Sequence, residues 1–363
     1  MKVQEKYLFR ALALAKNGLG LTYPNPLVGC VIVHQDQIIG EGFHIKAGEA
    51  HAEVNAINSV AQKELLPKSV VYVSLEPCSH FGKTPPCADL LIAHNVGKVV
   101  IATADPFAKV SGNGIKKLRA AGIPVEFGFL KAEAFELNKR FFTYHLAKRP
   151  FITLKFAQSE NGFIDKNDSK IGEPFWISND YSKQLSHKLR AQESAILVGK
   201  NTIISDNPSL TSRTWSGANP LRIIVDRKLE LASDLNIFND QAQTLVFYQE
   251  ATASEFMLDD HVSYAKIDGR ENLMFQIVEE LYQRGVQSLI VEGGAQVLNS
   301  FIQAGLYDEI WRFTGAVEFD SGVKAPEING VCTAEYFIKK DRLEIFKAPD
   351  DPVYQQFLNA INL

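Results

Sequence analysis

Apolar residues recur along the start of this chain with two alternating spacings. Within residues 5–17 they follow the helical period, and the run ends before Gly18. Residues 28–33 and 38–43 are short apolar runs on either side of the polar segment 34–37. A helix followed by a β-hairpin is therefore expected.

The same alternation continues through the first half. Strands are expected at 70–75 and 98–103, with helices beginning near His51 and Cys87 and another at 113–122. Strands separated by helices are typical of an α/β domain with a substantially parallel sheet.

A domain boundary is expected at Lys148-Arg149-Pro150. The predicted helix 132–148 must stop there, because proline cannot continue a helix and disfavours the helical conformation of its predecessor. A new strand is expected directly afterwards, at 151–157. The 363 residues then divide into domains at 1–148 and 149–363, which suits a chain too long for one typical domain.

The second half predicts another α/β domain. Its expected strands are 194–199, 221–226, 244–248 and 288–294. Its expected helices are 180–192, 271–284 and 295–304.

Composition excludes several classes of protein. The net charge of −4 does not suit a general nucleic-acid or membrane-surface binder, so we expect neither partner. Because no run of about 18 apolar residues occurs and residues 1–10 lack an apolar segment before a small-residue cleavage site, we expect neither a membrane span nor a signal peptide. Four cysteines without a secretion signal favour a reducing, cytoplasmic location.

Two of those cysteines bracket the segment E-P-C-S-H-F-G-K-T-P-P-C (76–87). Catalytic zinc takes three protein ligands and keeps a position open for water, and His51, Cys78 and Cys87 supply three. In zinc deaminases a glutamate two residues after the histidine moves protons, which is the position of Glu53. The second cysteine departs from the usual spacing, because it follows as C-x8-C rather than C-x2-C.

Other interpretations of these cysteines stay open on the residues alone. A structural zinc would use a fourth ligand, for which His80 is available. A disulfide between Cys78 and Cys87 is disfavoured in a reducing compartment. A nucleophilic cysteine paired with His80 leaves Glu53 unexplained.

The stretches T-Y-P-N-P-L-V-G-C-V (22–31), H-A-E (51–53) and 76–87 together resemble the bifunctional deaminase/reductase of riboflavin biosynthesis. That family carries the longer loop between its zinc cysteines. The resemblance implies an α/β fold: a cytidine-deaminase-like three-layer domain followed by a dihydrofolate-reductase-like α/β domain. It implies one Zn²⁺ per deaminase site, NADPH, and a pyrimidine ribosylamine phosphate as substrate.

The resemblance also implies roles for individual residues of the first domain. His51, Cys78 and Cys87 are the zinc ligands and Glu53 is the proton shuttle. The residues expected at the substrate are Asn25, His44, His80 and Lys83.

The cofactor site of the second domain has a weaker signal. There is no G-x-G-x-x-G, and V-E-G-G-A-Q-V-L (291–298) is a glycine turn between a predicted strand and helix, where amides could approach phosphates. The segment G-K-N-T-I-I-S-D-N-P-S-L-T-S-R (199–213) resembles a stretch of the family's reductases. The cofactor-binding residues implied are Ala157, Trp176, Thr202, Asp206, Gly294, Ala295, Gln296, Val297, Leu298, Asn299 and Ser300. The substrate-binding residues implied are Lys155, Arg190, Leu210, Arg213 and Glu292, with Lys155 and Glu292 as candidate proton donors.

The second domain departs from the family pattern at several positions. K-F-A-Q-S-E-N-G (155–162) has Asn161 where the family has aspartate, and Pro174 stands where many members have serine. After W-R-F-T the chain reads G-A-V-E-F-D-S-G rather than Pro-Lys followed by glycines.

Two rival functions are kept beside this interpretation. One is a zinc deaminase of another nucleoside or RNA with an inactive reductase-like domain. The other is a binding module with structural zinc and no turnover, in which Glu53→Gln would change nothing. We also expect a homo-oligomer.

Overall fold

The chain forms two compact units. The computed structural model describes residues 3–79, 81, 85–106, 112–166, 175–250, 256, 259–269, 272–348 and 351–361. The first unit comprises Met1–Lys148 and Pro352–Leu363, and the second Arg149–Asp351. The boundary after Lys148 lies where the sequence predicts it. The second unit ends at Asp351 and not at residue 363 as the sequence predicts, because the last helix, α10 (Pro352–Ala360), packs with the first unit.

The first unit is built on a mixed sheet. In order across the sheet its strands are β2 (Gln37–Phe43), β1 (Gly29–His34), β3 (Val70–Val73), β4 (Lys98–Ile101) and β5 (Val125–Phe127). The β1–β2 pair is the expected hairpin, β1 and β3 are also antiparallel, and β3, β4 and β5 run parallel. The parallel part therefore begins at the strand that precedes Cys78.

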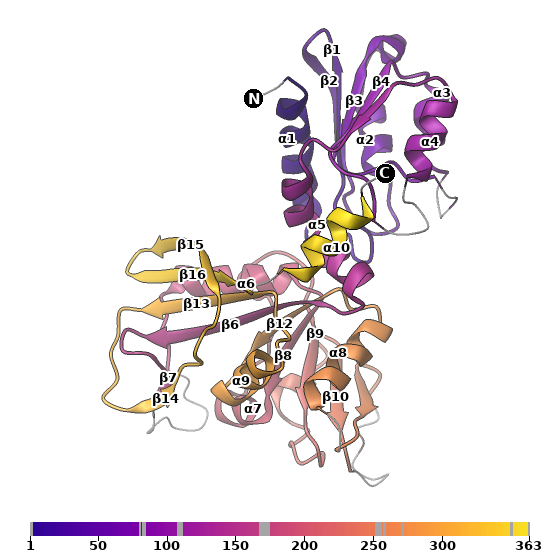
Figure 1. Cartoon of the computed structure of the whole chain (residues 1–363). Coiled ribbons are helices and arrows are strands. Elements are labelled where there is room, and N and C mark those ends of the chain that lie inside the picture. Colours follow the sequence, from indigo (N-terminus) through magenta and orange to yellow (C-terminus); the bar gives the residue numbers. More distant parts are fainter. Residues whose placement is uncertain are drawn as a thin grey trace. The chain divides into compact units, whose positions relative to one another are not determined.

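Helices cover both faces of this sheet, as expected of a three-layer domain (Figure 1). The helices are α1 (Val3–Ala15), α2 (Ala52–Ser59), α3 (Cys87–Ala93), α4 (Asn113–Ala120), α5 (Lys131–Ala147) and α10, with 3-10 turns η1 (Lys16–Gly18) and η2 (Lys63–Lys68). Successive strand residues face opposite sides, so Ile32 packs with α2, α3 and α4 whereas Val31 packs with α1.

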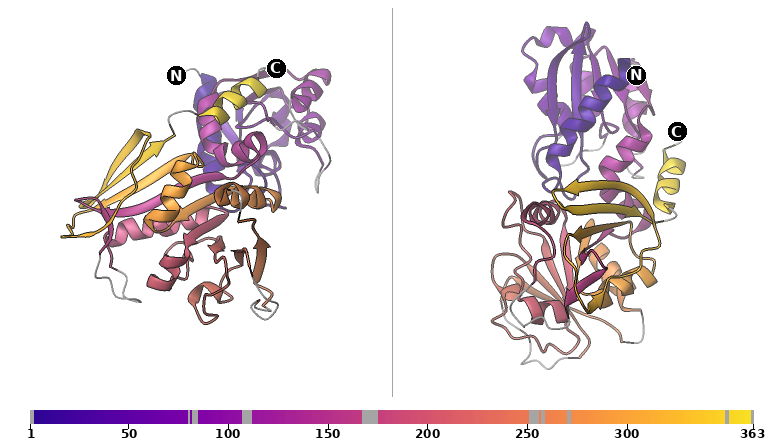
Figure 2. Two further views of the ribbon diagram at one scale, coloured as in Figure 1. Left: turned by 60° about the horizontal axis from the view of Figure 1, so that its bottom comes forward. Right: turned by 90° about the vertical axis from the view of Figure 1, so that its left-hand side faces the viewer.

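Helix α10 adds an aromatic group to the core of the first unit. Phe357 is fully buried, and its ring lies 4.8 Å from that of Phe142 and 5.2 Å from that of Phe135, both on α5. The yellow α10 lies beside α5 in Figures 1 and 2. Burial of this apolar surface explains why the end of the chain joins the first unit.

The second unit is built on a larger mixed sheet. In order across the sheet its strands are β11 (Val262–Lys266), β10 (Thr244–Tyr248), β9 (Leu221–Val225), β8 (Ala195–Gly199), β12 (Ser288–Glu292), β6 (Phe151–Ser159), β13 (Glu309–Gly315), β16 (Asp341–Lys347) and β15 (Val331–Ile338). From β11 to β13 all neighbours are parallel, and β16 and β15 are antiparallel additions. A separate small ribbon pairs β7 (Phe163–Lys166) with β14 (Gly322–Lys324).

Helices also pack on both faces of the second sheet. They are α6 (Asp180–Gln192), α7 (Lys200–Asp206), α8 (Leu273–Gln283) and α9 (Ala295–Gln303), with the 3-10 turn η3 (Asn236–Phe238). Ile277 of α8 and Phe301 of α9 share one core cluster, and Leu189 of α6 and Ile203 of α7 share the other. The sequence analysis did not anticipate α7 or the strands that follow α9.

Within the described residues, no helix combines the length and the apolar character needed to cross a membrane.

Candidate functional sites

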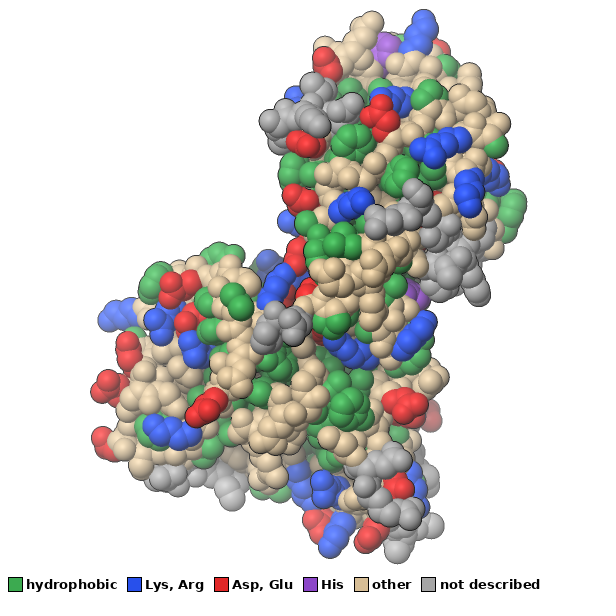
Figure 3. Space-filling model, in the orientation of Figure 1, with side chains coloured by type: hydrophobic (Ala, Val, Ile, Leu, Met, Phe, Trp, Pro, Cys, Tyr) green, Lys and Arg blue, Asp and Glu red, His purple; other side chains and the backbone are tan. Residues whose placement is uncertain are grey.

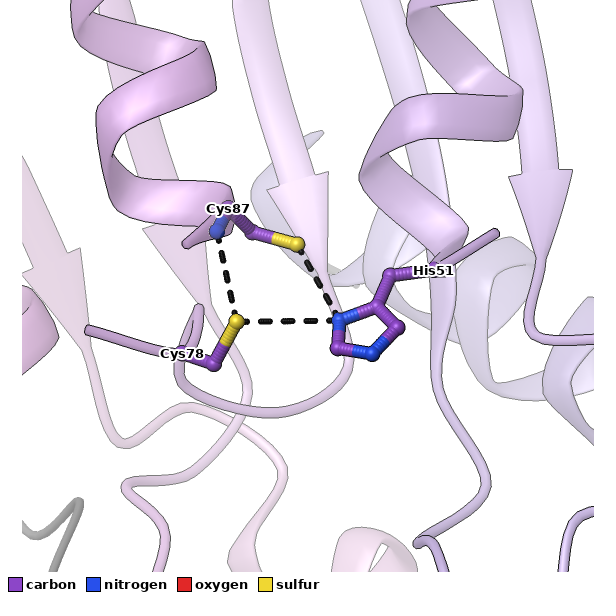
Figure 4. Close-up of side chains that lie close together, drawn as sticks. All are labelled: His51, Cys78 and Cys87. Carbon is purple, nitrogen blue, oxygen red and sulfur yellow. Dashed lines mark hydrogen bonds between the residues drawn. The ribbon is translucent and has the colours of Figure 1, made fainter. Parts of the chain in front are cut away.

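Three loop and helix-end residues converge in the first unit, as Figure 4 shows. His51 directly precedes α2, Cys78 follows β3, and Cys87 opens α3. The Nδ1 atom of His51 lies 3.6 Å from Sγ of Cys78 and 3.3 Å from Sγ of Cys87. All of the ligand atoms lie within 4.8 Å of one another. Both cysteines are free, so the disulfide interpretation is wrong.

This donor set fits zinc. One imidazole nitrogen and two thiol sulfurs are typical zinc ligands, and metal–ligand distances of about 2.0–2.3 Å place tetrahedral ligand atoms about as far apart as these are. His51 occupies the N-cap position of α2 with extended backbone but makes no side-chain hydrogen bond to the helix, so its ring is directed at the cysteines. The amide of Cys87 donates to Sγ of Cys78 at 3.2 Å and favours its thiolate.

The surroundings of Cys78 and Cys87 shift the pKa values of the two thiols in opposite directions. A hydrogen bond from Cys87, together with His51 and the Cys87 amide, outweighs burial and lowers the pKa of Cys78 to about 4. The same interaction with Cys78, with burial, raises the pKa of Cys87. Zinc binds cysteine as the thiolate, so its binding would release a proton from Cys87.

Glu53 lies in the first turn of α2 and is only 3% exposed. Burial first, and then the charge of Cys78, raise the pKa of its carboxyl group. A raised pKa brings a carboxyl group closer to the pH at which it can both accept and release a proton. The position and environment of Glu53 therefore suit a proton carrier.

Asn25 and His44 form a pair beside the cysteines and His51. Nδ1 of His44 lies 3.1 Å from the carbonyl oxygen of Ala50, so this nitrogen carries the hydrogen. Burial lowers the pKa of His44, which leaves Nε2 of the neutral ring to accept from Nδ2 of Asn25 at 3.1 Å. The Asn25 amide oxygen is then oriented by His44. His44, which we expect to face the substrate, is 2% exposed and contacts Asn25.

Two other residues expected at this site, His80 and Lys83, lie outside the described residues.

Sequence reasoning missed Glu76, which holds the start of the cysteine loop. Its buried carboxylate accepts backbone hydrogen bonds from Asp105, Gly112, Gly114 and Ile115 at 3.3, 3.0, 2.8 and 3.2 Å. Glu76 thereby ties α4 to the residue pair Pro77-Cys78. Its place in E-P-C was visible in the sequence, but the amides that it binds lie 29 to 39 residues away.

In the second unit a cavity of about 1010 Å³ lies at the carboxyl ends of β6, β8, β9 and β12. Ligands of open α/β sheets bind at this edge. The expected residues that line it are Lys155, Ala157, Trp176, Arg190, Thr202, Asp206, Leu210, Arg213, Glu292, Gly294, Ala295, Gln296, Val297 and Ser300. The side chain of Leu298 lies instead in the hydrophobic core, and Asn299 is not among the lining residues.

A buried group of charges forms one end of this cavity. Arg190 donates from Nε and Nη2 to the two carboxylate oxygens of Glu292, at 3.0 and 2.7 Å. Nζ of Lys155 lies 3.7 Å from Glu292. Burial opposes ionisation of Glu292, but Arg190 and Lys155 outweigh it and lower the pKa of Glu292 to about 2. Burial lowers the pKa of Lys155, which makes its ammonium group a better acid.

The turn before α9 fits the phosphates of a dinucleotide. Gly294 is the N-cap of α9, and its amide donates to Oγ1 of Thr202 at 3.1 Å. Amides of the first helical turn lack partners within the helix and attract anions. A Cβ atom on Gly199 would lie 2.8 Å from Cγ2 of Val297, so glycine allows α9 to approach the end of β8. Together with the size of the cavity, these features suit NADPH.

Two of the departures from the family pattern, Asn161 and the segment after W-R-F-T, contact each other in the structure. Nδ2 of Asn161 donates to the carbonyl oxygen of Phe319 at 2.7 Å, and Oδ1 accepts from the Phe319 amide at 3.2 Å. An aspartate could not make the first of these bonds. The side chain of Asn161 therefore suits the backbone of the segment that contains Phe319, which also departs from the family pattern. Pro174 lies outside the described residues.

Comparisons with known proteins match both units. The profile of the cytidine and deoxycytidylate deaminase zinc-binding region matches residues 1–103, and that of the RibD C-terminal domain matches residues 150–316. Riboflavin biosynthesis protein RibD of Aquifex aeolicus is 38% identical over 354 residues, which are 97% of this chain and 98% of the relative. RibD of Escherichia coli K12 is 35% identical over 327 residues, which are 84% of this chain and 86% of the relative.

Solved structures agree with these sequence matches. A diaminohydroxyphosphoribosylaminopyrimidine deaminase/5-amino-6-(5-phosphoribosylamino)uracil reductase from Thermotoga maritima has a TM-score of 0.86 and 36% identity, covering 95% of this chain and 99% of that one. RibD of Acinetobacter baumannii has a TM-score of 0.85 and 31% identity over 95% of this chain and 98% of that one.

Proposed function

This chain belongs to the RibD family, and on that premise we propose how its residues divide the family's two reactions. It is a bifunctional enzyme of riboflavin biosynthesis, with a zinc deaminase and an NADPH-dependent reductase. The rival functions with an inactive second domain or no turnover lose their support. The residue assignment rests on the convergence of His51, Cys78 and Cys87, with which the buried carboxyl group of Glu53 interacts.

The first unit deaminates a diaminopyrimidine ribosylamine 5′-phosphate to 5-amino-6-(5-phosphoribosylamino)uracil. His51, Cys78 and Cys87 hold zinc, which when bound acidifies water and supplies the nucleophile for the ring carbon. Glu53 accepts one proton from the attacking water and gives it to the ring nitrogen. It then takes the proton of the hydroxyl group added to the ring carbon and gives it to the departing amine, so the C–N bond breaks, ammonia leaves and a carbonyl group remains. Asn25, oriented by His44, accepts a hydrogen bond from the pyrimidine, while His80 and Lys83 bind toward the phosphate arm.

The second unit reduces the ribosyl group of that product to a ribityl chain. NADPH, when bound, supplies the hydride. The ring oxygen freed at the sugar needs a proton, and the buried ammonium group of Lys155, held beside Glu292, is placed to give it. Arg190 keeps Glu292 ionised, and with Leu210 and Arg213 it binds the substrate. The α9 turn and the residues Ala157, Trp176, Thr202 and Asp206 bind the cofactor.

Two variants and their mixture test this division. Glu53→Gln should retain zinc and release no ammonia, yet oxidise NADPH when given the aminouracil product. Lys155→Met should release ammonia and oxidise no NADPH. Mixed together, the two proteins should restore NADPH oxidation from the diaminopyrimidine, because the intermediate can diffuse between chains. Ammonia release by Glu53→Gln at the wild-type rate would refute the role of Glu53.

The chain also fits a homo-oligomer. Strand β15 is an edge strand whose Val331, Tyr336 and Phe337 side chains are 61%, 55% and 75% exposed. In Figure 3 acidic and basic side chains are interspersed over the visible face, and hydrophobic ones lie among them near β15 and β16. An exposed, apolar edge strand is a template for pairing with another copy. Tyr336→Lys/Phe337→Lys should therefore lower the mass measured by light scattering, and an unchanged mass would exclude this edge.

A cytoplasmic location is supported by the chemistry of the metal site. Cys78 and Cys87 bind zinc only as reduced thiols, which a reducing compartment maintains.

A further inference from the structure

A buried amide in the middle of helix α5 reaches a residue far away in the sequence. Asn138 is 2% exposed. Its Oδ1 accepts from the amide of Leu27 at 2.8 Å, and its Nδ2 donates to the carbonyl oxygen of Leu27 at 2.9 Å. Both functions of one side chain are thus used on the backbone of a residue 111 positions away.

Helix α5 is distorted at this residue. Asn138 has φ −108° and ψ 18°, which are not helical values. Asparagine is a poor residue for a helix interior, and its neighbours Leu137, Phe141 and Phe142 show that apolar side chains fill this face. An apolar residue here would make a more regular helix, so helix packing does not explain the amide.

The contact with Leu27 explains it. Leu27 is buried and lies just before β1, so the sheet does not pair its backbone groups. Buried backbone groups need partners, and Asn138 supplies both. Leu27 is also two residues from Asn25, with Pro26 between them to restrict the backbone.

Asn25 is thereby held on several sides. Its amide donates to the carbonyl oxygen of Thr22 at 2.7 Å, and its side chain bonds to His44 at 3.1 Å. The third restraint comes through Leu27 from Asn138. We propose that Asn138 is a positioning residue of the deaminase, which fixes segment 22–27 so that the amide of Asn25 meets the pyrimidine. This inference rests on the proposed function of Asn25.

Asn138→Ala tests it with the full-length, zinc-loaded protein. Leu27 then loses both partners, and kcat/KM for deamination should fall at least tenfold. Zinc content should remain one per chain, and kcat/KM of the reductase for the aminouracil product should not change. Equal deamination by the variant and the wild type would overturn the inference while leaving the deaminase assignment intact.

A matched control separates positioning from loss of stability. Phe142 lies on the same helix as Asn138 but packs against Phe135 and Phe357, so Phe142→Leu is the control. It should lower the unfolding temperature as much as Asn138→Ala and leave deamination kinetics nearly unchanged. If both variants lose activity in proportion to their stability, Asn138 has a structural role only.

A double-mutant cycle asks whether Asn138 acts through Asn25. In an Asn25→Ala background, Asn138→Ala should cost less than twofold in kcat/KM, because the group that it positions is gone. Independent, additive losses would contradict the proposal.

Hydrogen exchange gives a readout that does not depend on turnover. Asn138→Ala should speed exchange of the amide hydrogens of Asn25, Leu27 and Val28 and leave exchange in β3 unchanged. Unchanged exchange at Asn25, Leu27 and Val28 would overturn the inference even if the substrate of the first unit proved to be another one.

Discussion

At the scale of single residues, the charges of the second unit are arranged so that a buried carboxylate stays ionised. Arg190 contacts both oxygens of Glu292, and Lys155 lies 3.7 Å away. Removing one member of such a buried group leaves another charge without compensation. Protonation of Glu292 in acid would therefore leave Arg190 and Lys155 without their counter-charge.

This arrangement predicts how the second unit responds to acid. The pKa of Glu292 is lowered to about 2 in the folded chain, so its contribution to stability is complete above the unfolded value of 4.5 and is lost as pH falls toward 2. The lost contribution amounts to roughly 3 kcal/mol. Denaturant unfolding of the second unit at about pH 6 and at about pH 3 should show about 2 kcal/mol of this loss in wild type, because the pKa of about 2 in the folded chain lies below that range. The Glu292→Gln variant should show a much smaller one, and parallel curves would contradict the interpretation.

How far sequence alone predicts a residue's role depends on where its chemistry resides. The sequence singles out His51, Cys78, Cys87 and Glu53 because their side chains and spacing are those of a zinc deaminase site, and the structure brings the first three together. Asn138 could not be identified, because its partner is a backbone 111 positions away and nothing in its neighbourhood shows this.

At the scale of elements, helix α4 supports the metal loop. Gly114 lies so close to Pro77 that a Cβ atom on it would be 2.1 Å from the Pro77 carbonyl oxygen. Glu76 binds the first amides of the same helix. The helix and the loop that carries Cys78 are therefore one packed unit.

Gly114→Ala should disturb zinc binding from outside the ligand set. The added methyl group must push α4 away from Pro77, at a cost of about 1–3 kcal/mol or more. Zinc should leave this variant at least about tenfold faster in the presence of a chelator, since ligand supports typically affect metal affinity by that factor. Lys116→Ala, an exposed position on the same helix, is the control. If Gly114→Ala released zinc at the wild-type rate, α4 and the metal loop would be independent of each other.

Elements were predictable where local pattern determines them. The hairpin of β1 and β2 and the helix after His51 follow from apolar spacing and polar breaks. Strand β15 was not predicted. It is an edge strand whose side chains are mostly exposed, so its sequence lacks the alternation of apolar and polar residues that marks a half-buried strand. Helix α7 was not predicted either, because segment 199–213 was interpreted only through its resemblance to the family's reductases.

At the scale of the whole molecule, the chain passes between its units twice. It leaves the first unit after Lys148 and returns at Pro352. The sequence places the first crossing correctly, because Pro150 interrupts a helix. The second could not be foreseen, since an amphipathic helix does not reveal which of two cores it will join.

This return of the chain predicts which unit depends on α10. Phe357→Ala removes a fully buried ring and should cost about 3–5 kcal/mol in the first unit. Deaminase activity should then be lost at a lower temperature than in wild type, while reductase activity persists. Phe301→Ala, equally buried in the second unit, should give the opposite result. Loss of the reductase first in Phe357→Ala would contradict the assignment of α10.

The central claim is that one chain carries out both reactions in order. The most direct test is to add the diaminopyrimidine ribosylamine phosphate to zinc-loaded protein with NADPH, and to follow ammonia and NADPH together. The account predicts that ammonia appears first, that NADPH oxidation follows after a lag, and that one NADPH is used for each ammonia released. Ammonia without NADPH oxidation, or NADPH oxidation without ammonia, would contradict it.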